Sequence, residues 1–125
     1  MSENPTIKFT IAFNDPDLDS EELEYYAQNL LIQMRELDEV EVVDRVFDTH
    51  PPLGNKSVGA VLVGFLTAEI SRENARHLLE FLRERLRNKL IELEVEANGK
   101  KLKIKASSRK ELEAALSAAQ QFVEA

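Results

Sequence analysis

Apolar and polar residues alternate strictly near the start of the chain. Residues 7–13 place isoleucine or phenylalanine at every second position. Period two, with β-branched and aromatic side chains, is typical of a strand that buries one face. Asn14-Asp15-Pro16-Asp17 follows and predicts a turn, because proline lacks a backbone donor and Asn and Asp favour turns. We therefore expect a first strand over residues 7–13 that ends in an acidic turn.

A helix is expected directly after this turn. From residue 23 to residue 37, apolar side chains recur at steps of three and four and form one continuous stripe. Asp19 is placed to cap the helix, and Glu22, three positions later, completes a capping-box pattern. Residues 40–47 then predict a second strand. Such a strand–helix–strand unit predicts a right-handed crossover between two parallel strands, which are adjacent or have one strand between them.

Residues 57–70 form an apolar segment after a loop that contains Pro51-Pro52. Helix and strand are hard to separate by periodicity in a run that is apolar nearly all round. The length of the run favours a helix, since strands are usually shorter, although Gly59 and Gly64 oppose it. Residues 71–88 predict a further helix with an apolar inner stripe and an arginine-rich outer face.

The clearest pattern lies near the end of the chain. Residues 91–96 and 101–106 each alternate apolar and charged side chains, with glutamate in the first run and lysine in the second. Asn98-Gly99 lies between them and is a strong hairpin signal, because a type I′ turn needs positive φ at both positions. A two-residue turn sets the register, so that Glu96 faces Lys101, Glu94 faces Lys103, Glu92 faces Lys105, Val95 faces Leu102 and Leu93 faces Ile104.

A last helix completes the chain. Ser108, with Glu111 three positions later, is placed to cap it. The order of elements is therefore β-α-β-α-α-β-β-α. We predict a two-layer α+β fold, in which helices cover mainly one face of a four-stranded mixed sheet. The whole chain, residues 1–125, is expected to form a single domain with a flexible N-terminus at residues 1–5.

Charge is distributed unevenly along the chain. The net charge is −7, yet residues 1–48 hold 13 acids and 3 bases whereas residues 49–125 hold 10 acids and 13 bases. An acidic balance argues against a nucleic-acid partner, which normally requires a basic face. The opposite-signed halves are able to attract each other within one fold or between copies.

The absence of cysteine restricts the chemistry further. It excludes disulfides, thiolate metal sites and a cysteine nucleophile. The first residues lack a basic segment followed by an apolar run, so we expect no signal peptide. Both features fit a reducing compartment, and we expect a cytoplasmic location.

Side chains capable of catalysis or ligand binding are scattered. His50 lies in the proline loop and His77 on a helix, and neither has a second histidine at metal-ligand spacing. The aspartates of residues 15–19 alternate like part of a calcium loop, but Tyr26 stands where the bidentate glutamate belongs. The glycines form no phosphate loop. The sequence therefore predicts no catalytic residue, no cofactor and no metal, and hence no enzyme.

The apolar segment 57–70 is the main candidate for a binding surface. Core burial is one interpretation. A protein–protein interface is another, because an element that is apolar all round is hard to bury in so small a domain. Membrane association is a third, although about 20 apolar residues are needed to span a bilayer. The interface hypothesis assigns contacts to apolar side chains and to arginines of the next helix: Val58, Val61, Leu62, Phe65, Leu66, Arg72, Arg76 and Arg83.

The order of these features resembles a known family. An acidic Asp-Pro-Asp turn precedes a leucine-rich helix, a loop with Pro-Pro and glycine follows, and an apolar segment leads into an arginine-rich helix. Ile91-Glu-Leu-Glu-Val-Glu-Ala-Asn-Gly-Lys-Lys-Leu and then Ser-Ser-Arg-Lys-Glu-Leu complete the series. Over residues 6–123 the chain is similar to the effector-associated constant component family of bacterial conflict systems.

This resemblance implies a function. Members of the family are small non-enzymatic partners of effectors such as caspase-like or trypsin-like peptidases. We therefore expect an adaptor or regulatory module that binds an effector protein or a second copy of itself. A membrane-associating component that uses the apolar segment, and an enzyme whose site is assembled from scattered residues, are the alternatives.

Overall fold

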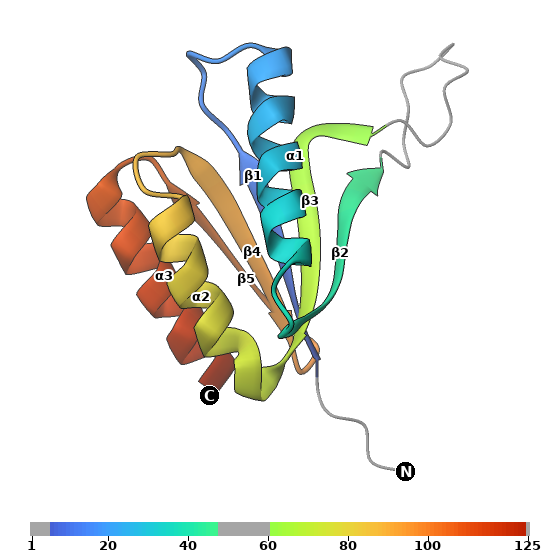
Figure 1. Ribbon diagram of the computed structural model, residues 1–125. Helices are drawn as coiled ribbons and strands as arrows, with labels where there is room; N and C mark the ends of the chain where they lie inside the picture. Colours follow the sequence, from blue (N-terminus) through green and yellow to red (C-terminus); the bar gives the residue numbers. More distant parts are fainter. Residues whose placement is uncertain (1–5, 48–60, 125) are drawn as a thin grey trace.

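The computed structural model describes residues 6–47 and 61–124, which contain five strands and three α-helices (Figure 1). The α+β class is thereby confirmed. The elements are β1 (Thr6–Phe13), α1 (Ser20–Arg35), β2 (Val40–Phe47), β3 (Val61–Ser71), the 3₁₀ turn η1 (Arg72–Asn74), α2 (Ala75–Arg85), β4 (Ile91–Ala97), β5 (Lys100–Ala106) and α3 (Arg109–Glu124).

The strands form one sheet in the order β2-β3-β1-β4-β5, and every neighbouring pair is antiparallel. β1 and β2 therefore run in the same direction with β3 between them, as the strand–helix–strand pattern predicts. Through β4 the connectivity is the split β-α-β arrangement of ferredoxin-like folds, and β5 extends the sheet at one edge. The prediction of a four-stranded mixed sheet is wrong, because the described residues form five strands without a parallel pair.

The error arises at the apolar segment 57–70, for which the sequence favours a helix. Its described part belongs to strand β3. Over residues 65–70 alternate side chains are buried beneath the helices, as Leu66 and Ile70 are, whereas Thr67 lies on the other face. β3 is central to the sheet and pairs with β1 on one side and β2 on the other. Pairing with residues that are distant in the sequence makes this segment a strand, and such pairing cannot be recognised from a local pattern.

The capping box and the hairpin predicted from local patterns are confirmed. The helix predicted over residues 71–88 is shorter, because Ser71 ends β3, Arg72–Asn74 form η1 and α2 spans Ala75–Arg85. Asp19 accepts a hydrogen bond from the Glu22 amide at 2.9 Å, and Glu22 accepts one from the Asp19 amide at 3.0 Å, so the capping box is present. In the hairpin, Asn98 and Gly99 have φ values of 55° and 74°. Every predicted pair between β4 and β5 is found. These features depend only on neighbours in the sequence, which explains why the sequence predicts them correctly.

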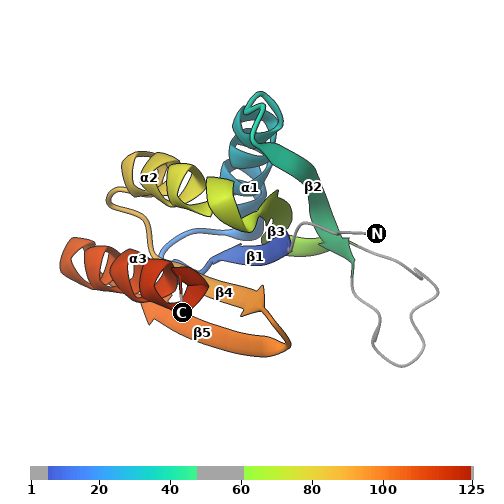
Figure 2. The ribbon, with the colours of Figure 1, turned by 90° about the horizontal axis from the view of Figure 1, so that it is seen from below.

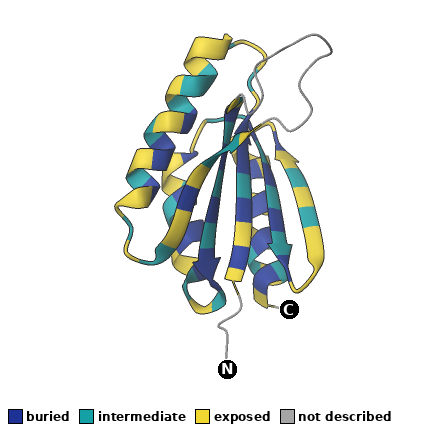
Figure 3. Cartoon of the chain, turned by 90° about the vertical axis from the view of Figure 1, so that its right-hand side faces the viewer, coloured by how far each residue is buried: buried dark blue, intermediate teal, exposed yellow. Residues whose placement is uncertain are grey.

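The helices cover one face of the sheet (Figure 2). α1 packs over β2 and β3, α3 packs over β5 and β4, and α2 lies beside α3. The core lies between the two layers and includes Phe9, Leu66, Leu82 and Leu116. The other face carries no helix within the described residues, and buried and exposed positions alternate along its strands (Figure 3). No helix in this part of the chain combines the length and apolarity needed to cross a membrane.

Candidate protein-interaction site

β3 bends at Gly64. Its ladder with β1 ends at Phe65. Beyond that point, within residues 6–47 and 61–124, β3 pairs only with the end of β2, where Val61 lies opposite Phe47 after a shift in register. Gly64 has a φ of +80°, a conformation that favours glycine. Residues 61–63 therefore leave the direction of the sheet and run toward the end of β2 (Figure 1).

Arg45 and Glu24 hold this bend. The side chain of Arg45, on β2, is 13% exposed; its Nε donates to the carbonyl oxygen of Phe65 at 2.8 Å and its Nη2 to that of Leu62 at 3.3 Å. Both Nη1 and Nη2 also donate to the carboxylate of Glu24 on α1. The same carboxylate accepts a hydrogen bond from the Gly64 amide at 2.8 Å. The Arg45–Glu24 pair therefore satisfies three backbone groups around the bend.

The contact with Arg45 changes the pKa of Glu24. The hydrogen bond from Arg45 lowers the pKa of Glu24, against the opposing effect of partial burial. The Gly64 amide and the positive charge of Arg45 lower that pKa further. Glu24 is therefore a carboxylate at neutral pH, as its role of accepting hydrogen bonds requires.

Phe47, Val61 and Val63 form an exposed apolar surface at the bent end of β3, which we call the apolar arm. Their exposed fractions are 55%, 37% and 41%. Phe47 and Val61 are cross-strand partners, so they belong to one continuous surface. Adjacent exposed apolar side chains of this size mark interaction sites more often than isolated ones do.

An acidic part of α1 lies close to the bend. A Cβ added at Gly64 would stand 3.4 Å from the Cβ of Leu23, so the start of α1 lies against β3 at this point. Asp19, Glu21 and Glu22 carry exposed carboxylates at the same end of α1. Negative charge near an apolar surface favours a partner whose own apolar surface is bordered by basic side chains.

The structure distributes the apolar residues of the predicted interface over different environments. Val61 is exposed, and Leu62 and Phe65 are half-buried, at the bent end of β3. Leu66 is fully buried beneath the helices, because its position in the strand alternation points it into the core. Val58 lies outside the described residues.

The arginines of the predicted interface lie away from the apolar arm. Arg72 and Arg76 follow the opposite end of β3. Arg83 lies between α2 and α3, where its Nε is 3.0 Å from a carboxylate oxygen of Glu113. The interface predicted from the sequence also omits Phe47 and Val63, which belong to the apolar arm. These two side chains come from different strands, and the pairing of β2 with β3 brings them to one surface.

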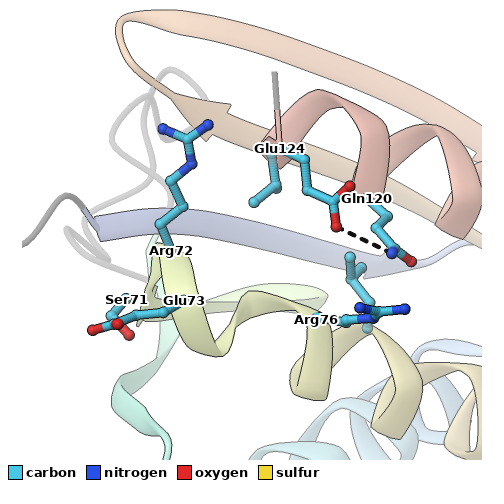
Figure 4. A pocket seen from close by; sticks show the side chains of 8 residues that line it. Ser71, Arg72, Glu73, Arg76, Gln120 and Glu124 are labelled. Carbon is cyan, nitrogen blue, oxygen red and sulfur yellow. Dashed lines mark hydrogen bonds between the residues drawn. The ribbon is translucent and has the colours of Figure 1, made fainter.

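A groove of about 600 Å³ lies between the start of α2 and the end of α3 (Figure 4). Arg72 and Arg76 line it together with Glu73 and Glu124, so the formal charges of its lining cancel. Gln120 donates a hydrogen bond to Glu124 at 3.2 Å, and both residues belong to α3, on one side of the groove. The lining of the groove therefore favours neither an anionic nor a cationic ligand.

The titratable side chains form no metal site in the part of the chain that the structure describes, where no three of them are placed to hold an ion. His77 is exposed on α2, with its Nδ1 4.0 Å from a carboxylate oxygen of Glu39. His50 lies outside the described residues. Asp15 accepts a hydrogen bond from the Asp17 amide at 2.9 Å, as expected of a turn rather than a calcium loop.

Comparison of the chain with protein-family models, with curated proteins and with solved structures finds no match. The resemblance to the effector-associated family remains a prediction from the order of elements.

Proposed function

We propose that this protein is a non-enzymatic adaptor that binds a partner protein through the apolar arm. The observation that supports this most is the exposure of Phe47, Val61 and Val63 on a bend that the Arg45–Glu24 pair holds in place. A surface held in its binding conformation loses less conformational entropy on association than a flexible one. The apolar arm is therefore suited to form the centre of an interface.

The family resemblance supports an effector protein as the partner, such as a caspase-like or trypsin-like peptidase. Protein interfaces typically place an apolar centre within a polar rim. Here the apolar arm supplies the centre, and the acidic start of α1 supplies part of the rim. A matching effector surface would be apolar with basic residues at its border.

Membrane association has weaker support. Leu66, Ala68 and Ile70, from the second half of the apolar segment, are completely buried in the core. Their insertion into a bilayer would require the sheet to open. We expect the folded protein not to float with anionic liposomes, and flotation under native conditions would favour this alternative.

Binding to purified caspase-like and trypsin-like effector proteins, measured by biolayer interferometry, tests the proposal. Phe47→Ser and Val63→Ser remove apolar surface from the arm. Ile32→Ser is the matched control, because Ile32 is an apolar side chain on α1 with a comparable exposed fraction of 48%. We expect the two arm variants to weaken binding by about tenfold or more, and the control to bind like wild type.

Two results would contradict the proposal. One is the absence of binding between the wild-type chain and effectors of either class. The other is equal weakening by the arm variants and Ile32→Ser, which would show that the apolar arm has no special part in the contact. Circular dichroism of each variant verifies that a loss of binding does not reflect unfolding.

A further inference from the structure

The two edges of the sheet carry opposite charge. Residues 36–44, which join α1 to β2 and include most of β2, contain five acids and no base. Residues 98–110, which include β5 and the start of α3, contain six bases and no acid. β2 and β5 are the edge strands of the sheet, so these segments lie on opposite sides of the molecule (Figure 2). We call them the acidic edge and the basic edge.

Many of these charges have no ionic partner within the described residues. Glu36 and Glu41 on the acidic edge are exposed and make no ion pair there. The same is true of Lys100, Lys103 and Lys110 on the basic edge, whereas the lysines at positions 101 and 105 pair with glutamates of β4. Unneutralised charge of opposite sign on two faces of one molecule attracts a second copy in solution.

The two edges also match in direction and position. β2 and β5 each run parallel to β1, because two antiparallel pairings separate each of them from it. Asp44 and Lys103 stand at the two ends of one row of cross-strand partners, with Thr67, Thr10 and Glu94 between them. Three residues earlier on β5 stands Lys100, opposite Ala97, and at the corresponding end of β2 Glu41 stands at the register shift between Val40 and Val42.

We propose that copies of this protein associate head to tail, with the basic edge of one copy against the acidic edge of the next. A sideways shift of one copy along the row of strands brings Lys103 to the level of Asp44, and Lys100 to the level of Val40, next to Glu41. Lysines on an edge strand disfavour direct strand pairing, so the contact is made by charged side chains. It is independent of the apolar arm, which lies at the far end of β2 and on β3.

The nature of this contact determines how it behaves. Because the two edges differ, each copy uses one edge for each neighbour, and the contact produces rings or open chains of copies rather than a two-fold symmetric dimer. Exposed ion pairs are individually weak, so association depends on protein concentration. Salt reduces the range of the attraction from about 10 Å at 0.1 M to about 3 Å at 1 M, and we expect the association constant to fall about tenfold or more over this interval.

Sedimentation velocity of the full chain, over a range of protein and salt concentrations, tests this proposal. Glu41→Lys with Asp44→Lys changes the charge of the acidic edge from −5 to −1, and Lys100→Glu with Lys103→Glu changes that of the basic edge from +6 to +2. Each pair of substitutions therefore places like charges opposite each other at the proposed contact. We expect each double variant alone to remain monomeric at low salt, where wild type associates. An equimolar mixture of the two should associate again. This recovery also demonstrates that both variants are folded.

A chain that combines all four substitutions exchanges the charges at the substituted positions, so that opposite charges face each other there again, and we expect it to regain association. Glu80→Lys, an exposed reversal on α2, controls for net charge and should leave association unchanged. Phe47→Ser should also associate normally, which separates this proposal from effector binding by the apolar arm.

Three results would overturn the proposal. The first is a wild-type chain that stays monomeric at low salt at every concentration. The second is the failure of the two double variants to associate when mixed. The third is a monomeric wild type whose basic edge binds heparin or duplex DNA, with loss of that binding in the variant with Lys100→Glu and Lys103→Glu, because the basic edge would then recognise a polyanion.

Discussion

Replacement of Arg45 by methionine should destabilise the protein by about 2–3 kcal/mol, because it removes the donors that satisfy the bend in β3. The substitution keeps an unbranched apolar side chain but leaves the carbonyl oxygens of Leu62 and Phe65 without their partner. A buried polar group left unsatisfied costs about 1–3 kcal/mol. Glu24 contributes less, because its side chain is 37% exposed and water replaces part of the lost pairing.

Arg35 provides a matched control. Its Nη2 donates to the carbonyl oxygen of Val43 at 3.3 Å and lies 3.8 Å from a carboxylate oxygen of Asp44, but the side chain is 59% exposed. The side chain of Asp44 is 63% exposed, so water solvates its carboxylate after the arginine is removed, and a single backbone acceptor loses a long hydrogen bond. Arg35→Met should therefore cost less than about 0.5 kcal/mol. Urea denaturation followed by circular dichroism measures both free energies of unfolding, and equal m-values verify that the variants are comparable.

Similar losses of stability in the two variants would refute the special role of Arg45 in holding the bend. So would a loss of less than about 1 kcal/mol for Arg45→Met alone. Arg45→Lys adds a second comparison, since lysine keeps the charge but lacks the planar fork that reaches several acceptors at once. We expect its stability to lie between those of wild type and Arg45→Met.

Three further changes test the bend in β3 and the start of α3. Glu24→Gln should lower the free energy of unfolding at neutral pH, and the difference from wild type should disappear in acid. A carboxyl group with a lowered pKa stabilises the fold fully above the ordinary pKa of glutamate and loses this effect as the pH falls through the lowered value; urea denaturation across pH measures it. Gly64→Ala should destabilise the protein more than Gly99→Ala, as thermal denaturation would measure. Both positions have positive φ, a conformation that costs an L-residue about 1–2 kcal/mol. A Cβ at Gly64 would also lie 3.2 Å from a backbone oxygen, whereas no atom lies within 4 Å of a Cβ at Gly99. Ser108→Ala should cost about 1 kcal/mol, because the Ser108 hydroxyl accepts a hydrogen bond from the backbone of α3 at 3.1 Å; chemical denaturation provides the value.

The parts of the fold that depend on nearby residues are predictable from the sequence. The hairpin of β4 and β5 follows from Asn98-Gly99 and from the alternation on both sides of it, and its register is found as expected. The capping box of Asp19 and Glu22 likewise involves residues within four consecutive positions. In each case the interacting groups are close in sequence, so their chemistry alone specifies the structure.

The location of β3 depends on residues that are far apart in the sequence. Its alternation over residues 65–70 is preceded by a run that is apolar at nearly every position, which hides the period of a strand. The segment forms a strand because it lies between β1 and β2 and makes a ladder of hydrogen bonds with each. The sequence therefore indicates the correct fold class but not the number or order of the strands.

The candidate site was even less accessible to sequence reasoning. Arg45 in β2 is the available signal, because a charged side chain on a strand needs a partner where a helix covers that strand. Neither Glu24 as the partner nor Gly64 as the point of bending follows from local patterns. Both require the packing of α1 on β2 and β3.

Hydrogen–deuterium exchange of the chain, with and without a bound effector protein, tests most directly whether the apolar arm is the binding surface. We predict that the effector slows exchange at the amides of Val61 to Val63 and at the end of β2 around Phe47, while the groove between α2 and α3 exchanges at the same rate as before. Slowed exchange confined to α2 and α3, with the apolar arm unchanged, would contradict this assignment.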